Sequence, residues 1–193
     1  MRIDDQTDLV VKTGPLAIIS QYFEPDSRSY GIVTAHGRQV AEKAVGIARN
    51  MPAESLDLVL ISEAAMLHDI GIFMTHTPTL DCSGKYPYIC HGYLGRKLLE
   101  KHGIHKHALV CERHVGVGIS KDEIRQLNLP LPEREMIPVT MEEKIICYAD
   151  KFFSKSGSAS SREKSVDEVI ATLERYGRDK VERFMEWHEC FKT

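Results

Sequence analysis

The chain has 193 residues and a formal net charge of −3, from 25 basic and 28 acidic side chains. This balance argues against an extended nucleic-acid surface, although it permits a local basic pocket for a phosphate group. No apolar run approaches the roughly 18–20 residues that a membrane helix needs, and the start of the chain lacks the pattern of a signal peptide. The length corresponds to about one domain. Five cysteines form no C-x-x-C pair and are odd in number, so we expect a reduced, cytoplasmic protein.

Helical periodicity follows the chain almost from end to end. Apolar residues recur at spacings of three and four, and strand patterns are nearly absent, so the predicted fold is all-α. A short helix begins near Pro15. The predicted helices that follow it span 29–50, 56–68, 88–102, 105–114, 120–129, 140–153, 166–176 and 178–191.

Two segments interrupt this pattern. Residues 71–86 are polar and turn-rich, and a loop of this length is often functional. Its side chains with the longest polar reach are His76, Lys85 and Tyr86. Residues 156–161 form a Ser- and Gly-rich stretch that we interpret as a linker.

Three helix starts have the S/T-x-x-E form of a capping box. They are Ser120–Glu123, Thr140–Glu143 and Ser165–Glu168. Each predicts a serine or threonine hydroxyl bound to the helix backbone, with the glutamate bonding back.

His68 and Asp69 are adjacent residues of two types that commonly bind metal ions. An apolar, helix-favouring run leads into this pair, and we expect Gly71 to let the chain leave the helix. A buried, ionised aspartate needs a partner, and a divalent cation beside a neutral imidazole is a suitable one. An isolated pair of this kind would more often be a core histidine next to a surface charge.

Further ligand-type residues lie on other predicted helices. His36 shares a helix face with the apolar Val40, and Asp150 lies in an apolar helix where an unpaired carboxylate would be costly. His91 begins one helix and His114 ends another. By contrast, we expect the histidines of the connecting turn to be solvated: His102, His105 and His107.

The order of these six residues resembles the HD-domain superfamily of metal-dependent phosphohydrolases, in the subset written H…HD…H…H…D. Residues 68–71 spell its HDIG signature, and Ala149-Asp150-Lys151 is similar to its terminal aspartate motif. The resemblance covers about residues 30–155. It implies an HD-domain helical bundle with flanking C-terminal helices, in which 1–193 form a single domain.

The resemblance also implies a metal set. One ion would be held by His36, His68, Asp69 and Asp150, and a second by His91 and His114, with Asp69 bridging. We therefore expect two divalent ions among Fe, Mn, Zn, Ni and Co. In such a dinuclear site a metal-bridging hydroxide would attack the phosphorus atom of the substrate.

Many relatives carry a lysine directly after the HDIG signature, where this chain has Ile72. A phosphate contact would then come from another cation, and the candidates are Lys85, Arg113 and Lys151. The expected partner is a small phosphorylated substrate, in first place a nucleotide.

Three functions are compatible with the pattern. The favoured one is a phosphohydrolase acting on a nucleotide or another small phosphorylated metabolite, such as the dinucleoside polyphosphates split by similar bacterial HD hydrolases. Cyclic dinucleotide phosphodiesterases of the HD-GYP type fit less well, because Leu94 stands where they have proline. The alternatives are a mixed-valent di-iron oxygenase acting on a small polar metabolite, and a non-catalytic signalling or binding module. The sequence leaves metal identity and oligomeric state open.

Overall fold

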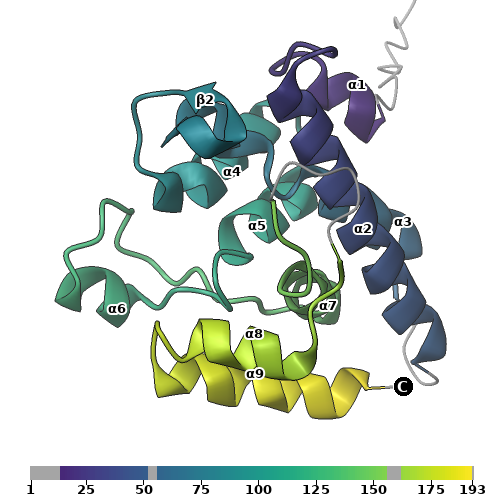
Figure 1. The fold of residues 1–193 in the computed structure, drawn as a ribbon, viewed down its shortest axis with the longest axis vertical. Coiled ribbons are helices and arrows are strands. Elements are labelled where there is room, and N and C mark those ends of the chain that lie inside the picture. Colours follow the sequence, from purple (N-terminus) through teal and green to yellow (C-terminus); the bar gives the residue numbers. More distant parts are fainter. Residues whose placement is uncertain (1–13, 52–55, 156–161, 193) are drawn as a thin grey trace, which may run out of the picture.

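The computed structural model describes residues 14–51, 56–155 and 162–192. The expected linker at 156–161 therefore lies outside the described residues. The elements, in chain order, are α1 (Pro15–Ile19), α2 (Arg28–Asn50), α3 (Leu58–Leu67), η1 (Ile70–Met74), β1 (His76–Thr77), η2 (Pro78–Leu80), β2 (Cys82–Ser83), η3 (Tyr88–Cys90), α4 (His91–Lys101), α5 (His105–Arg113), α6 (Lys121–Gln126), α7 (Met141–Asp150), α8 (Val166–Leu173) and α9 (Arg178–Phe191). The fold is a helical bundle, as predicted (Figure 1).

Helix α2 connects two hydrophobic cores. Its first half contributes to one core together with residues of α1, η1, α4 and α5, and its second half contributes to another together with residues of α3, α7 and the C-terminal helices. Val33 belongs to the first core and Val40 to the second. His36 lies between them on the same helix and is buried. An inward polar side chain is therefore placed at the boundary between the two cores.

The C-terminal helices cover α7, the helix that carries Asp150. Figure 1 shows α8 and α9 side by side along one edge of the bundle. Phe184 of α9 stacks on Tyr148 of α7 with ring centroids 5.1 Å apart, and the Tyr148 hydroxyl bonds His188 Nδ1 at 2.8 Å. Burial of aromatic rings at this interface stabilises the position of α7.

The segment after the HDIG signature contains more regular structure than its composition predicts. Within 71–86, β1 and β2 form an antiparallel pair in which His76 faces Ser83 and Thr77 faces Cys82. Two 3-10 turns flank and connect these strands. A two-residue strand has too few positions for an alternating pattern, so sequence periodicity could not reveal it.

Gly71 has a different role from the one expected. It does not have a positive φ that would mark a left-handed helix end. Instead, a Cβ atom at position 71 would lie 2.1 Å from the His91 carbonyl oxygen and 2.6 Å from the Gly95 amide nitrogen. Glycine is required here because the backbones of η1 and α4 touch.

The capping predictions hold for two helices and in part for the third. Ser120 and Ser165 form full capping boxes at the starts of α6 and α8. The Thr140 hydroxyl accepts a hydrogen bond from the Glu143 amide, as expected. The Glu143 carboxylate, however, does not close the box. It accepts a hydrogen bond from the Val139 amide at 2.7 Å and pairs with Arg113. Arg113 on the neighbouring helix α5 draws this carboxylate away from the box.

In the part of the chain that the structure describes, none of the helices has both the length and the apolar character required to cross a membrane.

Candidate metal centre

Six buried side chains from five helical elements and one connecting turn meet at the boundary between the two cores. Each has 6% or less of its surface exposed. They are His36 of α2, His68 at the end of α3, Asp69 in the turn that follows, His91 at the start of α4, His114 at the end of α5, and Asp150 at the end of α7. Four of the six thus lie at helix ends, where turns bring their side chains together.

The two oxygens of Asp69 face different partners. Oδ2 lies 3.2 Å from His68 Nε2 and 3.5 Å from His36 Nε2. Oδ1 lies 3.3 Å from His91 Nε2 and 3.4 Å from His114 Nε2. The carboxylate therefore lies between two pairs of imidazoles.

The short contacts of Asp150 are with one of these pairs, His36 and His68. Its Oδ1 is 2.8 Å from His36 Nε2 and 3.4 Å from His68 Nε2. Three overlapping groups have ligand atoms within 4.8 Å of one another: His36, His68 and Asp69; His68, His114 and Asp150; and Asp69, His91 and His114. Each group offers imidazole nitrogen and carboxylate oxygen, a donor set that suits divalent transition metals.

Three of the histidines are oriented by their own helical turns. His68 Nδ1 lies 2.6 Å from the Ala65 carbonyl oxygen, and His91 Nδ1 lies 2.7 Å from that of Tyr88. His114 Nδ1 makes the same contact with Cys111 at 2.7 Å. A carbonyl oxygen can only accept, so Nδ1 carries the proton and Nε2 is directed to the centre, as in metal-bound histidines.

The environment of these atoms fits a cation. Both Nδ1 atoms of His91 and His114 donate to carbonyls, so the two neutral rings present unprotonated Nε2 atoms to each other at 3.0 Å. His68 Nε2 and both oxygens of Asp69 are buried without a hydrogen-bond partner. Buried polar atoms are ordinarily satisfied, and a positive ion between these atoms would satisfy them together.

Charge and burial move the pKa values in opposite directions within the cluster. Burial, with Lys155 adding to the effect, lowers the pKa of His36 to about 4, and burial together with His114 lowers that of His91 to about 3. Burial also opposes the protonation of His68, but Asp69 and Asp150 outweigh it and raise its pKa to about 9. Metal binding at His68 would therefore release a proton.

Lys155 enters the centre from a position that the sequence did not indicate. Its ammonium lies 2.9 Å from Asp69 Oδ2 and 3.9 Å from Asp150 Oδ1. Asp69 Oδ2 has no hydrogen-bond partner, so this contact is an ion pair alone. Helix α7 ends at Asp150, and the following turn returns Lys155 to the cluster. A lysine beyond a helix end has no periodic signal, so sequence analysis missed it.

The proposed phosphate contacts have different surroundings. Lys151 borders the cluster, with its ammonium 2.7 Å from Asp150 Oδ2 and 3.2 Å from the His114 carbonyl oxygen. Arg113 instead binds both oxygens of Glu143 at 2.8 and 2.9 Å. Lys85 is exposed, and its ammonium lies 5.4 Å from the Tyr86 ring centroid. Of the three, the described part of the chain brings only Lys151 to the six side chains.

Two histidines expected to be solvated have partners. His102 Nε2 bonds the Tyr22 hydroxyl at 2.7 Å, and His107 Nε2 lies 3.2 Å from Glu63 Oε2. Both are half-buried, whereas His105 is exposed as expected. These contacts tie the turn after α1 to the end of α4, and α3 to the first turn of α5.

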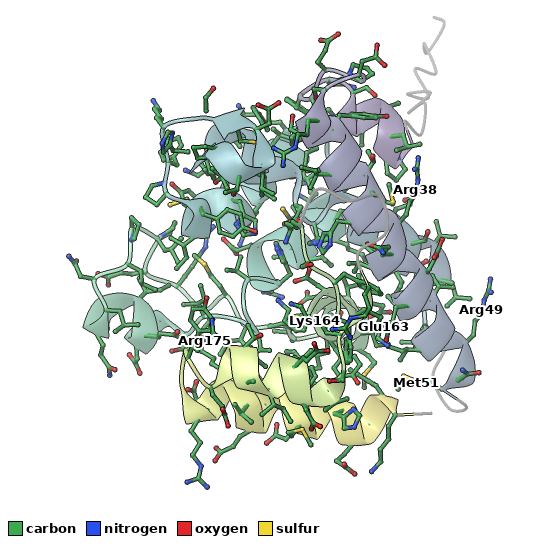
Figure 2. The ribbon with its side chains drawn as sticks, in the orientation of Figure 1. Arg38, Arg49, Met51, Glu163, Lys164 and Arg175 are labelled. Carbon is green, nitrogen blue, oxygen red and sulfur yellow. The ribbon has the colours of Figure 1, made fainter. Side chains whose placement is uncertain are left out.

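The segment that follows the undescribed residues returns near α7. Figure 2 shows Glu163 and Lys164 between α2 and α8. Glu163 pairs with Lys43 of α2 at 2.6 Å, and the Lys164 amide donates to the Phe152 carbonyl at 2.9 Å. Lys164 is thereby held near the charges of Asp150, Lys151 and Lys155.

Comparison with known proteins places this arrangement in a family. The chain is 32% identical over 146 residues to an uncharacterized protein of Methanocaldococcus jannaschii, covering 74% of this chain and 76% of that protein. It is 30% identical over 160 residues to a tRNA (cytidine(56)-2'-O)-methyltransferase of Thermoplasma volcanium, covering 82% of this chain but only 41% of the longer relative.

A solved structure has a similar fold. The HD domain of the L. monocytogenes phosphodiesterase PgpH superposes with a TM-score of 0.52 at 14% identity, covering 89% of this chain and 93% of that one. The family model described as "HD domain" matches residues 33–154, which include all six clustered side chains. The chain therefore belongs to the HD-domain family.

Proposed function

We propose that this protein is a metal-dependent phosphohydrolase with a dinuclear centre, acting on a nucleotide or another small phosphorylated metabolite. The observation that carries the proposal is the division of Asp69 between two pairs of histidines. Oδ2 faces His36 and His68, and Oδ1 faces His91 and His114, each within 3.5 Å. Membership of the HD-domain family supports the same chemistry.

The ligand set divides into two. His36, His68, Asp69 and Asp150 would hold one ion, and His91, His114 and Asp69 the other. Such ions supply Lewis acidity towards phosphoryl oxygens and lower the pKa of a coordinated water. The protein contributes rings that are already oriented by backbone carbonyls and a buried site that strengthens electrostatic interactions.

The first test is metal content, measured by elemental analysis after reconstitution with Mn, Co, Zn or Fe under anaerobic conditions. We expect about two equivalents per chain in the native protein. Asn at position 69 keeps the size of the side chain but removes its charge, and Asp69→Asn should bind fewer ions. A native stoichiometry of one ion per chain would contradict the dinuclear arrangement.

The second test is phosphate release from a panel of nucleoside mono-, di- and triphosphates, dinucleoside polyphosphates and cyclic dinucleotides. We expect activity with at least one of them, supported by Mn or Co as well as by Fe. Activity confined to the iron form and dependent on O2 would instead indicate the oxygenase. Full metal loading without turnover of any substrate would favour a binding module.

A further inference from the structure

The charges around the centre do not balance once a metal ion is bound. Two carboxylates, Asp69 and Asp150, contact two ammonium groups, Lys155 and Lys151, at 2.9 and 2.7 Å. These four charges sum to zero, and the proton that His68 holds in the metal-free protein is displaced when a metal ion binds. Every divalent ion added to the neutral histidines and the two carboxylates therefore leaves excess positive charge. A buried excess of charge is costly unless an anion compensates it.

Lys155 is the ammonium best placed to meet such an anion. The six clustered residues are 6% exposed or less, whereas the Lys155 side chain is 16% exposed. Lys151 is held by two contacts, to Asp150 and to the His114 carbonyl. The carboxylate contact of Lys155 at hydrogen-bond distance is with Asp69, the same oxygen that faces His36 and His68. A metal ion at that oxygen would compete with the ammonium for it.

Tyr88 adds an aromatic surface beside this lysine. Tyr88 is 40% exposed, and its ring lies 4.6 Å, centroid to centroid, from the ring of His91. Burial raises the pKa of its hydroxyl, and the nearby Lys155 ammonium opposes this rise. The partly exposed side chains that contact the buried centre thus include a cation and a planar ring, held next to each other.

We propose that Lys155, beside Tyr88, binds a non-bridging phosphoryl oxygen of the substrate, and that the centre selects substrates with at least two negative charges near the cleaved bond. This inference rests on the proposed function and names its substrate class: polyanionic phosphates such as pyrophosphate-linked nucleotides, with a planar base available to Tyr88. A charge-assisted lysine–phosphate contact gives affinity in such a site.

The test separates anion binding from turnover. Binding of inorganic phosphate and of pyrophosphate to the metal-loaded protein is measured by calorimetry, with metal content determined on the same sample. We expect pyrophosphate to bind more tightly than phosphate. Lys155→Met should weaken both by at least about tenfold, and Lys155→Arg should restore part of the loss. The matched control is Lys106→Met, in the first turn of α5 and distant from His114 at its other end.

Three results would overturn the anion site at Lys155, and a fourth would separate it from the proposed function. Unchanged anion binding in Lys155→Met with native metal content would overturn the inference, as would a loss of metal in that variant, which would make Lys155 a structural counter-ion. Absence of anion binding by the metal-loaded native protein would overturn it too. If the native protein binds pyrophosphate through Lys155 but hydrolyses no phosphate ester, the proposed function fails and the anion site stands.

Discussion

Asp69 and Glu112 are both about 1% exposed, but different partners surround them. Glu112 on α5 is held by two guanidinium groups, those of Arg96 and Arg134. Arg134 Nε donates to Glu112 Oε1 at 3.0 Å. Asp69 faces four imidazole nitrogens and one ammonium, and neither of its oxygens has a hydrogen bond.

This contrast separates a structural charge from a reactive one. Glu112 joins α4, α5 and the segment that precedes α7. Both of its carboxylate oxygens are paired with guanidinium groups of the protein. A buried carboxylate that the fold leaves without hydrogen bonds is the one available to a ligand. Burial alone would not have distinguished the two.

The largest expected effect is on activity, from Asp69→Asn. Removing the charge shared by both pairs of histidines should lower turnover by at least about hundredfold, since loss of a supporting residue outside the ligand set already costs 10- to 100-fold. Phosphate release measures this. Thermal unfolding in EDTA should show a folded variant, and an unfolded one would assign Asp69 a structural role like that of Glu112.

Glu112→Gln should lower the stability of the fold and leave metal binding unchanged. Two arginines would lose their counter-charge, and we expect a loss of about 3 kcal/mol in the free energy of unfolding, the lower end for a broken buried pair, because both guanidiniums reach solvent. Urea unfolding of the metal-free protein measures it. Metal content should not change, and a fall in metal content would connect the two regions.

The pH dependence of the metal-free protein should report the centre. His36 and His91 have folded pKa values of about 4 and 3, so the unfolded chain binds more protons and stability should rise between pH 4 and 6.5. His68, with a pKa of about 9, should make stability fall between pH 6.5 and 9. Thermal unfolding in EDTA should therefore show a maximum near pH 6.5. A flat profile over this range would contradict the inferred charges.

The smallest expected effect is that of Arg134→Met. Arg134 is 42% exposed and shares Glu112 with Arg96, so one guanidinium would still pair with the carboxylate. We expect a loss of about 1 kcal/mol, the net value of one ordinary hydrogen bond. Urea unfolding alongside Glu112→Gln measures the difference. Equal losses in the two variants would show that the arginines act only as a unit.

The sequence predicted the features that depend on repetition and on residue type. The spacing of Val33, Val40 and their neighbours indicated α2, and the residue types at 68–69 and 150 indicated metal ligands. The convergence of His91 and His114 on Asp69 depended on family resemblance, because no local pattern specifies how distant helix ends meet.

Features that arise from tertiary contact were not predictable. Gly71 is required by the approach of α4, not by its own helix end. Glu143 left its capping box because Arg113 lies across from it. Lys155 reaches Asp69 only because the chain turns back after α7. In each case the deciding partner is distant in sequence or lies beyond a turn.

The bonds from Nδ1 of His68, His91 and His114 to carbonyls three residues earlier have an entropic consequence. Each ring is immobilised by its own turn of backbone, so its rotational freedom is lost when the helices form. Ligand capture then has little side-chain ordering left to impose, and this preorganisation raises affinity without any additional contact. Part of the free energy of binding has thus been committed at the folding step.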